Sequence, residues 1–257
     1  MTTEDALKEL AIIGFGSFGK LAAKHLSAKF DVVVADVQDK SDEAKAFGVR
    51  FVPINEAAKK RVVILAVPVD KLKSILQDIR KDVTNGALIL DVCSVKMLPV
   101  KLMTEILPAD VEIIGTHPLF GPQSAHTGLQ GHKIALCPVR TSRMDHVISF
   151  LSSLGLKTII TTAIEHDKQM AKTQALSHFI GKALINLGIQ KEDISVPSFD
   201  KLLELTALLK NDSDELLKTI LSDNPFAGQT IIEFSDQLES ELKRFSILKP
   251  IVVETRK

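Results

Sequence analysis

From Leu10 to about Thr162, short runs of valine, isoleucine and leucine alternate with longer amphipathic stretches. Each run is too short for an isolated helix and nearly apolar throughout, which is typical of strands covered by helices on both faces of a parallel sheet. We therefore predict parallel strands joined by crossover helices. The predicted strands are Leu10–Ile13, Asp31–Ala35, Val62–Val67, Ala87–Asp91, Val111–Gly115, Ile134–Cys137 and Thr158–Thr161.

Beyond Ile164 the apolar positions recur with helical spacing, and no further strand is predicted. The sequence thus predicts an α/β fold in two domains: a doubly wound, mostly parallel Rossmann-type sheet in residues 1–162 and an all-helical domain in residues 163–257. The predicted helices of the second domain are a long stretch up to Leu187, then Phe199–Lys210, Asp214–Leu221 and Pro225–Phe245.

The predicted C-terminal helices are rich in apolar positions. Because a monomer of two layers needs fewer of them, we expect a homodimer that forms through these helices. The alternative is that the helices simply cover one another. The apolar positions include Ile220, Leu221, Phe226, Ile231, Ile232, Phe234 and Leu238.

A glycine-rich turn follows the first predicted strand. In AIIGFGSFGK, three glycines have the spacing Gly-x-Gly-x-x-Gly at the head of a helix predicted for Ser17–Lys29. The first permits a tight turn, the second lets backbone approach a pyrophosphate, and the third lets helix pack on strand, with the helix N-terminus facing the negative charge. Glycine turns are common after strands, so the whole context, rather than the spacing, predicts a dinucleotide site. Its expected residues are Gly14, Phe15, Gly16, Ser17, Phe18 and Gly19.

The second predicted strand leads into Asp36, at about the distance where a carboxylate accepts hydrogen bonds from the adenosine ribose. A carboxylate there repels a 2′-phosphate, and no basic residue follows before Lys40, so we expect NAD in preference to NADP. A solvated strand end is the alternative for Asp36. Val67 and Pro68, in the turn AVPVD, lie where open α/β sheets bind ligands, although Pro68 alone could mark a plain turn.

Two other predicted strand ends carry polar residues, in DVCSVK and GTHPLFGP. Because the carboxyl ends of parallel strands share one edge, Ser94 and His117 could converge beside a nicotinamide. A histidine before proline in a glycine-bounded loop has no evident packing role, which favours His117 as a functional residue. Ser94 is alternatively a helix cap for Val95–Ile106, and His178, within an apolar helical stretch, is alternatively a core residue.

Composition narrows the chemistry further. The 32 basic and 32 acidic residues are interspersed, which argues against nucleic acid or an anionic membrane surface as a partner. Tyrosine and tryptophan are absent, so acid–base chemistry falls to His, Asp, Glu, Lys or Cys.

The cysteines and the termini bear on the compartment. Cys93 and Cys137 lie alone in apolar surroundings, as inert buried thiols do, and we expect neither a disulfide nor a metal. The start MTTEDALKEL lacks a basic segment followed by an apolar run, and no apolar stretch is long enough to span a membrane. The expected setting is the cytoplasm.

The segments GFGSFG, DVCSVK, GTHPLFGP and EHDKQMAKTQALSHFIG occur in an order and spacing that resemble those of the prephenate/arogenate dehydrogenase family. The stretch KNDSDELLKTILSDN looks most like the plant-type arogenate dehydrogenases. The resemblance implies an oxidative decarboxylation in which hydride leaves ring carbon 4 for the nicotinamide, the ring carboxylate leaves as carbon dioxide and the ring becomes aromatic. The expected partner is a small molecule, arogenate or prephenate.

The resemblance also implies roles for single residues. His117 matches the catalytic histidine that takes the proton of the carbon-4 hydroxyl, and Ser94 matches a serine that orients that hydroxyl or the histidine. His178 matches a histidine on the substrate side of the cleft, where Gln174 is a further expected contact. Asp212 matches an acidic residue that favours arogenate, whose side chain bears an ammonium that prephenate lacks. A helix N-cap is the alternative for Asp212.

The chain departs from many bacterial members at LTALLK, around Thr206, where they carry an arginine that pairs with a substrate carboxylate. Because a carboxylate at Asp212 would attract the amino group of arogenate, we expect arogenate, with prephenate as the alternative. A β-hydroxyacid or imine reductase could use Lys168, Lys172 or Lys182, but that reading leaves GTHPLFGP unexplained. The non-enzyme alternative is a nucleotide-binding protein that has lost its chemistry.

The remaining histidines receive no chemical role. His166 and Asp167 open the interdomain helix, and we interpret them as a structural pair because a charged first turn suits the helix dipole. Four others have no usable motif around them and are expected at the surface or in loops: His25, His126, His132 and His146.

Overall fold

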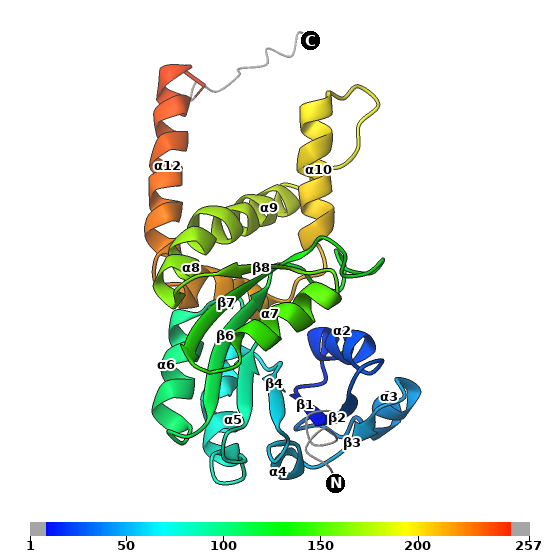
Figure 1. The fold of residues 1–257 in the computed structure, drawn as a ribbon. Helices are drawn as coiled ribbons and strands as arrows, with labels where there is room; N and C mark the ends of the chain where they lie inside the picture. Colours follow the sequence, from blue (N-terminus) through cyan, green and yellow to red (C-terminus); the bar gives the residue numbers. More distant parts are fainter. Residues whose placement is uncertain (1–8, 248–257) are drawn as a thin grey trace, which may run out of the picture.

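The computed structural model describes residues 9–247 and contains one eight-stranded sheet in the order β3-β2-β1-β4-β5-β6-β7-β8 (Figure 1). The segment before Glu9, which entered the expectation about the compartment, lies outside the described residues. The strands are β1 Glu9–Ile13, β2 Asp31–Ala35, β3 Arg50–Phe51, β4 Val62–Leu65, β5 Leu88–Asp91, β6 Glu112–Pro118, β7 Lys133–Arg140 and β8 Lys157–Ile160.

The strands β1 to β6 run parallel, which confirms the predicted doubly wound Rossmann-type sheet. One pairing differs from the prediction, since β6 and β7 are antiparallel. A loop rather than a crossover helix joins these two strands, so the chain returns along the sheet from the same edge. β8 then pairs parallel with β7. The strand β3 escaped prediction because only Arg50 and Phe51 form it.

Helices cover both faces of the sheet. On one face, alternate strand residues such as Ala11, Val63 and Ile113 pack with α5 and α6. On the other face, residues such as Ile12 and Ile114 pack with α2 or α7. This alternation reflects the two-residue period of a strand. The helices of this domain are α2 Ser17–Leu26, α3 Ser41–Ala46, α4 Ile54–Ala57, α5 Val69–Ile79, α6 Met97–Ile106 and α7 Met144–Ser153.

An apolar cavity of about 260 Å³ lies among α2, α7 and the sheet. Its lining includes Leu21 and Ala22 of α2 and Val147 of α7. The ring of His25 also lines it, and the Nε2 atom is shielded from solvent without a hydrogen-bond partner. The expectation of a surface or loop position for His25 is therefore wrong, because the inner side of an amphipathic helix carries it.

The C-terminal part is helical, as predicted, and stands at one end of the sheet (Figure 1). The last strand ends at Ile160 and the helix begins at Ala163, next to the predicted domain boundary, which itself stays a prediction. Within residues 9–247 no helix is long and apolar enough to cross a membrane. The helical segments are α8 Ala163–Met170, η1 Ala171–Ala175, α9 Leu176–Asn186, α10 Pro197–Leu209, α11 Asp214–Lys218, η2 Thr219–Asp223 and α12 Ala227–Arg244.

Candidate active site

The glycine turn sits between β1 and α2 with a geometry that only glycine permits at two positions. Gly14 has φ +101°, and a Cβ there would meet the carbonyl oxygen of Ala66 at 2.3 Å. A Cβ on Gly19 would meet the carbonyl oxygen of Gly14 at 2.0 Å. By contrast, a Cβ on Gly16 would meet nothing within 4 Å. The turn therefore packs tightly on the sheet and leaves its outer backbone open.

The open side of this turn fits a dinucleotide pyrophosphate. Gly16 is the N-cap of α2 and Ser17 begins the helix, both are exposed, and no side chain caps the helix. Unpaired backbone N–H groups at a helix N-terminus attract a phosphate. Phe18 is half-buried, whereas Phe15 is fully buried against Phe47, so Phe15 can offer a dinucleotide only its backbone.

Asp36 follows β2 and fastens the glycine turn. Its Oδ2 accepts a hydrogen bond from the backbone N–H of Phe15 at 2.7 Å, and its Oδ1 accepts one from Gln38 at 3.0 Å. The carboxylate remains partly exposed, with lone pairs left for a ribose hydroxyl. Val67 lies beside Gly14, and Pro68 precedes α5 as its N-cap, so both stand at the same sheet edge as the glycine turn.

Ser94 lies between β5 and α6, half-buried, and its hydroxyl makes no hydrogen bond within residues 9–247. The helix-cap alternative is wrong, because α6 begins only at Met97. The loop around Ser94 is held by a buried ion pair between Lys96 and Asp91, and Lys96 Nζ also donates to the carbonyl oxygen of Thr116 at 2.6 Å. This ion pair fixes the loop after β5 to β6, the strand that carries His117.

His117 is buried near the carboxyl end of β6, with 4% of its surface exposed. We expected it in a loop; β6 instead continues to Pro118 because residues 114–118 pair with β7. The Nδ1 atom lies 2.9 Å from Nε2 of His166. The other ring nitrogen, Nε2, has no hydrogen bond within the described chain and is not shut off from solvent.

The electrostatic surroundings keep the His117 imidazole neutral. Burial, helped by the nearby charges of His166, Lys96 and His178, holds the pKa of His117 well below its ordinary value of 6.5. A neutral imidazole has one nitrogen that can accept a proton. His117 can therefore act as a general base at neutral pH. An ordinary histidine, by contrast, is partly protonated at that pH.

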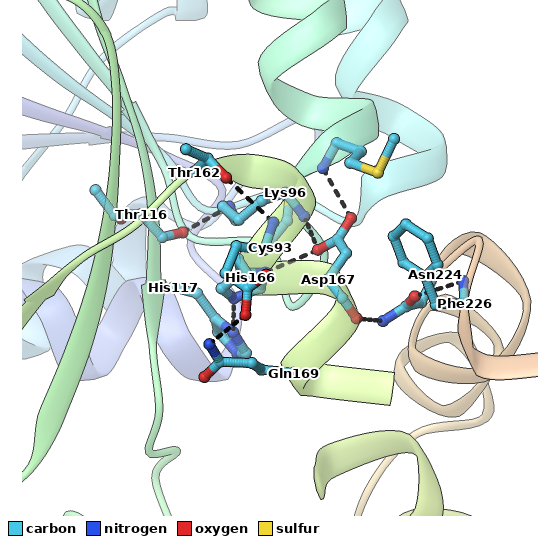
Figure 2. A network of polar contacts seen from close by, with 12 residues as sticks. Cys93, Lys96, Thr116, His117, Thr162, His166, Asp167, Gln169, Asn224 and Phe226 are labelled. Atoms are coloured by element: carbon cyan, nitrogen blue, oxygen red, sulfur yellow. Dashed lines mark hydrogen bonds and ion pairs between the residues drawn. The ribbon is translucent and has the colours of Figure 1, made fainter. Parts of the chain in front are cut away.

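His166 and Asp167, which we interpreted as a plain helix start, are buried beside His117 (Figure 2). His166 Nδ1 lies 2.7 Å from Asp167 Oδ1. Asp167 also accepts hydrogen bonds from the backbone N–H groups of Lys96 at 2.7 Å and Met97 at 2.9 Å. The carboxylate of Asp167 does lie at a helix N-terminus. That helix is α6, whereas Asp167 itself belongs to α8.

In the helical part of the chain, His178 contacts Asp212, with 3.3 Å between Nε2 and Oδ2. His178 Nδ1 donates to the backbone carbonyl oxygen of Gln174 at 2.8 Å. Gln174 itself belongs to the π-helical segment η1, a kind of irregularity frequent at functional sites. The N-cap alternative for Asp212 is wrong, because Ser213 caps α11. The side chain of His178 is 13% exposed and both of its ring nitrogens have polar partners, as the core alternative also expects.

The His178–Asp212 contact must contain a proton. A carbonyl oxygen only accepts, so the Nδ1 of His178 carries a hydrogen; Nε2 and a carboxylate oxygen would otherwise face each other as two acceptors. Either His178 is an imidazolium or Asp212 is a carboxylic acid. Burial raises the pKa of Asp212, while His178 opposes that rise. The pair thus offers a site for a charged or hydrogen-bonding substrate group.

Cys93 and Cys137 are buried and unpaired, as expected of inert thiols. Burial raises the pKa of both, which disfavours the reactive thiolate. Within residues 9–247, no group of three or more His, Cys, Asp or Glu side chains is placed to hold a metal ion. His126 and His146 are exposed and His132 is half-buried in a loop, as expected.

Known proteins resemble most of the chain. A family model described as prephenate dehydrogenase, nucleotide-binding domain, matches residues 21–160, more than half of the chain. Arogenate dehydrogenase 1, chloroplastic, of Arabidopsis thaliana is 28% identical over 90% of this chain and 38% of its own length. The probable arogenate/prephenate dehydrogenase of Methanocaldococcus jannaschii is 30% identical over 88% of this chain and 51% of its own. The chain therefore spans about half or less of these two relatives.

Among solved structures, the prephenate dehydrogenase from A. aeolicus, in complex with hydroxyphenyl propionate and NAD+, superposes with a TM-score of 0.74. The superposition covers 93% of this chain and 92% of that one, at 19% sequence identity. At that identity the likeness establishes the shared fold, including the sheet and the C-terminal helices.

Proposed function

The chain belongs to the prephenate dehydrogenase family, and from this membership we propose that it is an NAD-dependent enzyme that converts arogenate to tyrosine by oxidative decarboxylation. The same chemistry on prephenate, which yields 4-hydroxyphenylpyruvate, is the alternative. The observation that carries the proposal is a buried, neutral imidazole, His117, at the sheet edge where the glycine turn offers a dinucleotide site.

The chain's own groups supply the proton chemistry. As the O–H bond of the ring hydroxyl breaks, its proton passes to Nε2 of His117. Hydride leaves ring carbon 4, the carbon that bears this hydroxyl. The bond to the ring carboxylate then breaks, carbon dioxide departs, and the electron pair makes the ring aromatic. The proton on His117 returns to the phenolic oxygen, so substrate and NAD give tyrosine, carbon dioxide and NADH. NAD, when bound, supplies the hydride acceptor. We assign to Ser94 the orientation of the hydroxyl.

The charges around the end of β2 support NAD rather than NADP. Asp36 and Asp39 are both acidic, and a 2′-phosphate would meet them. The nearest lysines are already paired: Lys20 contacts Glu43, and Lys40 Nζ lies 3.0 Å from the same carboxylate. No free cation follows β2 before α3 to bind a phosphate. Glycines 14, 16 and 19 would hold the pyrophosphate and Asp36 the ribose.

The His178–Asp212 pair supports arogenate. A substrate ammonium would interact favourably with the Asp212 carboxylate, whereas the keto acid of prephenate would not. No arginine replaces the missing anchor in α10, where Thr206 uses its hydroxyl on the carbonyl oxygen of Leu203. Gln174 presents its backbone carbonyl oxygen to His178 and is half-buried, which supports its assignment to substrate binding.

The lysine-dependent reductase alternative finds less support. Lys168 lies over the ring of Phe226 at 5.8 Å, and Lys182 lies 3.7 Å from Asp214. Lys172 is exposed in η1. None of these three lysines contacts His117 within the described residues. A lysine-dependent reductase would therefore not explain why the His117 imidazole is buried at this edge of the sheet.

We propose three further features of the working protein. Residues 1–162 would bind the dinucleotide, and residues 163–257 would bind substrate and dimerise. Exposed apolar side chains on α10 and α12 support a homodimer through these helices. Two buried unpaired thiols suit a reducing compartment, and we propose the cytoplasm.

A substrate panel tests the proposal. NADH formation and carbon dioxide release are followed with arogenate and prephenate, each with NAD and NADP. We expect arogenate with NAD to give the highest kcat/KM.

In Asp212→Asn the preference for arogenate should fall at least about tenfold, because one charge contact with the substrate is lost. Asp214→Asn, two residues away and exposed, should keep the preference. No carbon dioxide release from either substrate would refute the function, and unchanged preference in Asp212→Asn would refute the role of that residue.

A further inference from the structure

Three buried side chains form an unbroken line of contacts from the start of α6 to the ring nitrogen of His117 (Figure 2). Asp167 is fully buried, His166 is 3% exposed and His117 is 4% exposed. The contacts measure 2.7 Å between Asp167 Oδ1 and His166 Nδ1 and 2.9 Å between His166 Nε2 and His117 Nδ1. Because water is excluded from these contacts, each hydrogen in the line must be supplied by one of the three side chains.

The positions of the hydrogens follow from the donors at the far end. Asp167 accepts from two backbone N–H groups, Lys96 and Met97, which cannot act as acceptors. Its carboxylate therefore offers only lone pairs to His166, and Nδ1 of His166 must carry a hydrogen. A neutral His166 then has a lone pair on Nε2, which can only accept. The hydrogen between the two imidazoles consequently belongs to Nδ1 of His117.

We propose that His166 and Asp167 are positioning residues that hold His117 as the tautomer with hydrogen on Nδ1, so that its solvent-accessible Nε2 is the base that receives the substrate proton. The inference rests on the proposed function for the identity of that proton. When Nε2 accepts it, the imidazolium already donates through Nδ1 to His166, and the Asp167 carboxylate lies beyond. The line thereby orients the ring before the reaction and stabilises its charge during it.

The surrounding structure holds this line rigidly. Asp167 bridges α8 to the N-terminus of α6, and its own backbone carbonyl oxygen accepts a hydrogen bond from Asn224 at 2.9 Å. Asn224 is also buried and joins η2 to α12. Through Asn224, Asp167 therefore connects the later part of the helical domain with the start of α6, and the geometry of His117 depends on both domains.

Two substitutions of His166 separate positioning from mere packing. In His166→Gln, the carboxylate of Asp167 selects the amide N–H, which leaves the amide oxygen to accept from His117 Nδ1. In His166→Leu the packing volume remains but both hydrogen bonds are lost. His146→Leu, the same change at an exposed histidine of α7, is the matched control. Circular dichroism and NAD binding confirm that each variant folds.

Nitrogen-15 NMR of the histidine rings reads the tautomers without any substrate, with the variants serving to assign the signals. We expect hydrogen on Nδ1 of both His117 and His166 in the wild type and on Nδ1 of His117 in His166→Gln. In turnover with arogenate, kcat should fall roughly 10- to 1,000-fold in His166→Leu, with KM within about threefold. His166→Gln should recover most of that loss.

Hydrogen on Nε2 of His117 in the wild type would overturn the proposal, and so would full turnover in His166→Leu or an equal loss in both variants. The two readouts also distinguish this inference from the proposed function. If the tautomers are as expected but no substrate is turned over, the proposed function alone fails. If turnover is normal while the hydrogen sits on Nε2, the positioning role alone fails.

Discussion

Gly16 and Gly19 lie three residues apart in the glycine turn, but their surroundings differ. A Cβ on Gly19 would collide with backbone, whereas the space around Gly16 is open. Gly19→Ala should therefore destabilise the fold by about 2 kcal/mol or more, measured by urea unfolding. Gly16→Ala should leave stability within about 0.5 kcal/mol but weaken NAD binding at least about tenfold, measured by calorimetry, because its methyl group occupies the pyrophosphate's approach.

The opposite pattern for the two glycines would contradict this division of roles. Normal NAD affinity in Gly16→Ala would show that the dinucleotide does not approach the turn at that point. Ser27→Ala, at an exposed position just beyond the end of α2, serves as the control and should change neither stability nor NAD affinity.

Single residues were predictable from sequence where a local pattern demanded them. The glycine turn and the polar strand ends depend on backbone conformation and strand direction, which the local sequence encodes. The burial of His166 and Asp167 was not predictable, because their partners lie about 50 and 70 residues away in the sequence. One signal pointed to them: Asp167, Ala171 and Ala175 share one helix face by four-residue spacing, and both alanines are fully buried.

At the scale of elements, the apolar runs located seven of the eight strands to within a few residues. The direction of β7 was beyond this reasoning, because apolar composition does not distinguish parallel from antiparallel pairing. The connection was the better indicator of strand direction. The segment between β6 and β7 lacks the apolar periodicity of a crossover helix, which a parallel pair would need. Helix ends were less predictable; α2 stops at Leu26 instead of Lys29.

The cavity between α2, α7 and the sheet gives a stability prediction for these elements. Ala22 lines the cavity. The larger side chain in Ala22→Leu would therefore fill empty space without displacing other side chains. We expect a gain of roughly 1–2 kcal/mol in the free energy of unfolding, from methyl and methylene groups newly buried. Lys24→Leu, exposed on the same helix, should bring no such gain. A loss of stability in Ala22→Leu would show that α2 packs more tightly on the sheet than described.

At the scale of the whole molecule, α10 and α12 extend away from the sheet on either side of α9 (Figure 1). Ile232 and Leu238 of α12 are 56% and 50% exposed, and Leu208 of α10 is 54% exposed. Large apolar side chains exposed to solvent favour a partner surface, and a second copy of the chain is the partner we propose.

The double substitution Ile232→Asp, Leu238→Asp should convert the dimer to a monomer, because it places charges in an apolar interface. Sedimentation equilibrium measures the outcome. Ile160→Asp, the same kind of change at an exposed apolar residue of β8, should leave the dimer intact. A monomeric wild type, or a dimer that survives the double substitution, would contradict dimerisation through α12.

In the proposed reaction, His117 takes the proton of the hydroxyl group while hydride leaves the ring carbon that bears this group. The most direct test is His117→Asn, with kcat for NADH formation from arogenate and the affinity for NAD measured on the same preparation. We expect a kcat lower by about 10²- to 10⁴-fold, with NAD affinity within about twofold of wild type. Full turnover in His117→Asn would contradict this role.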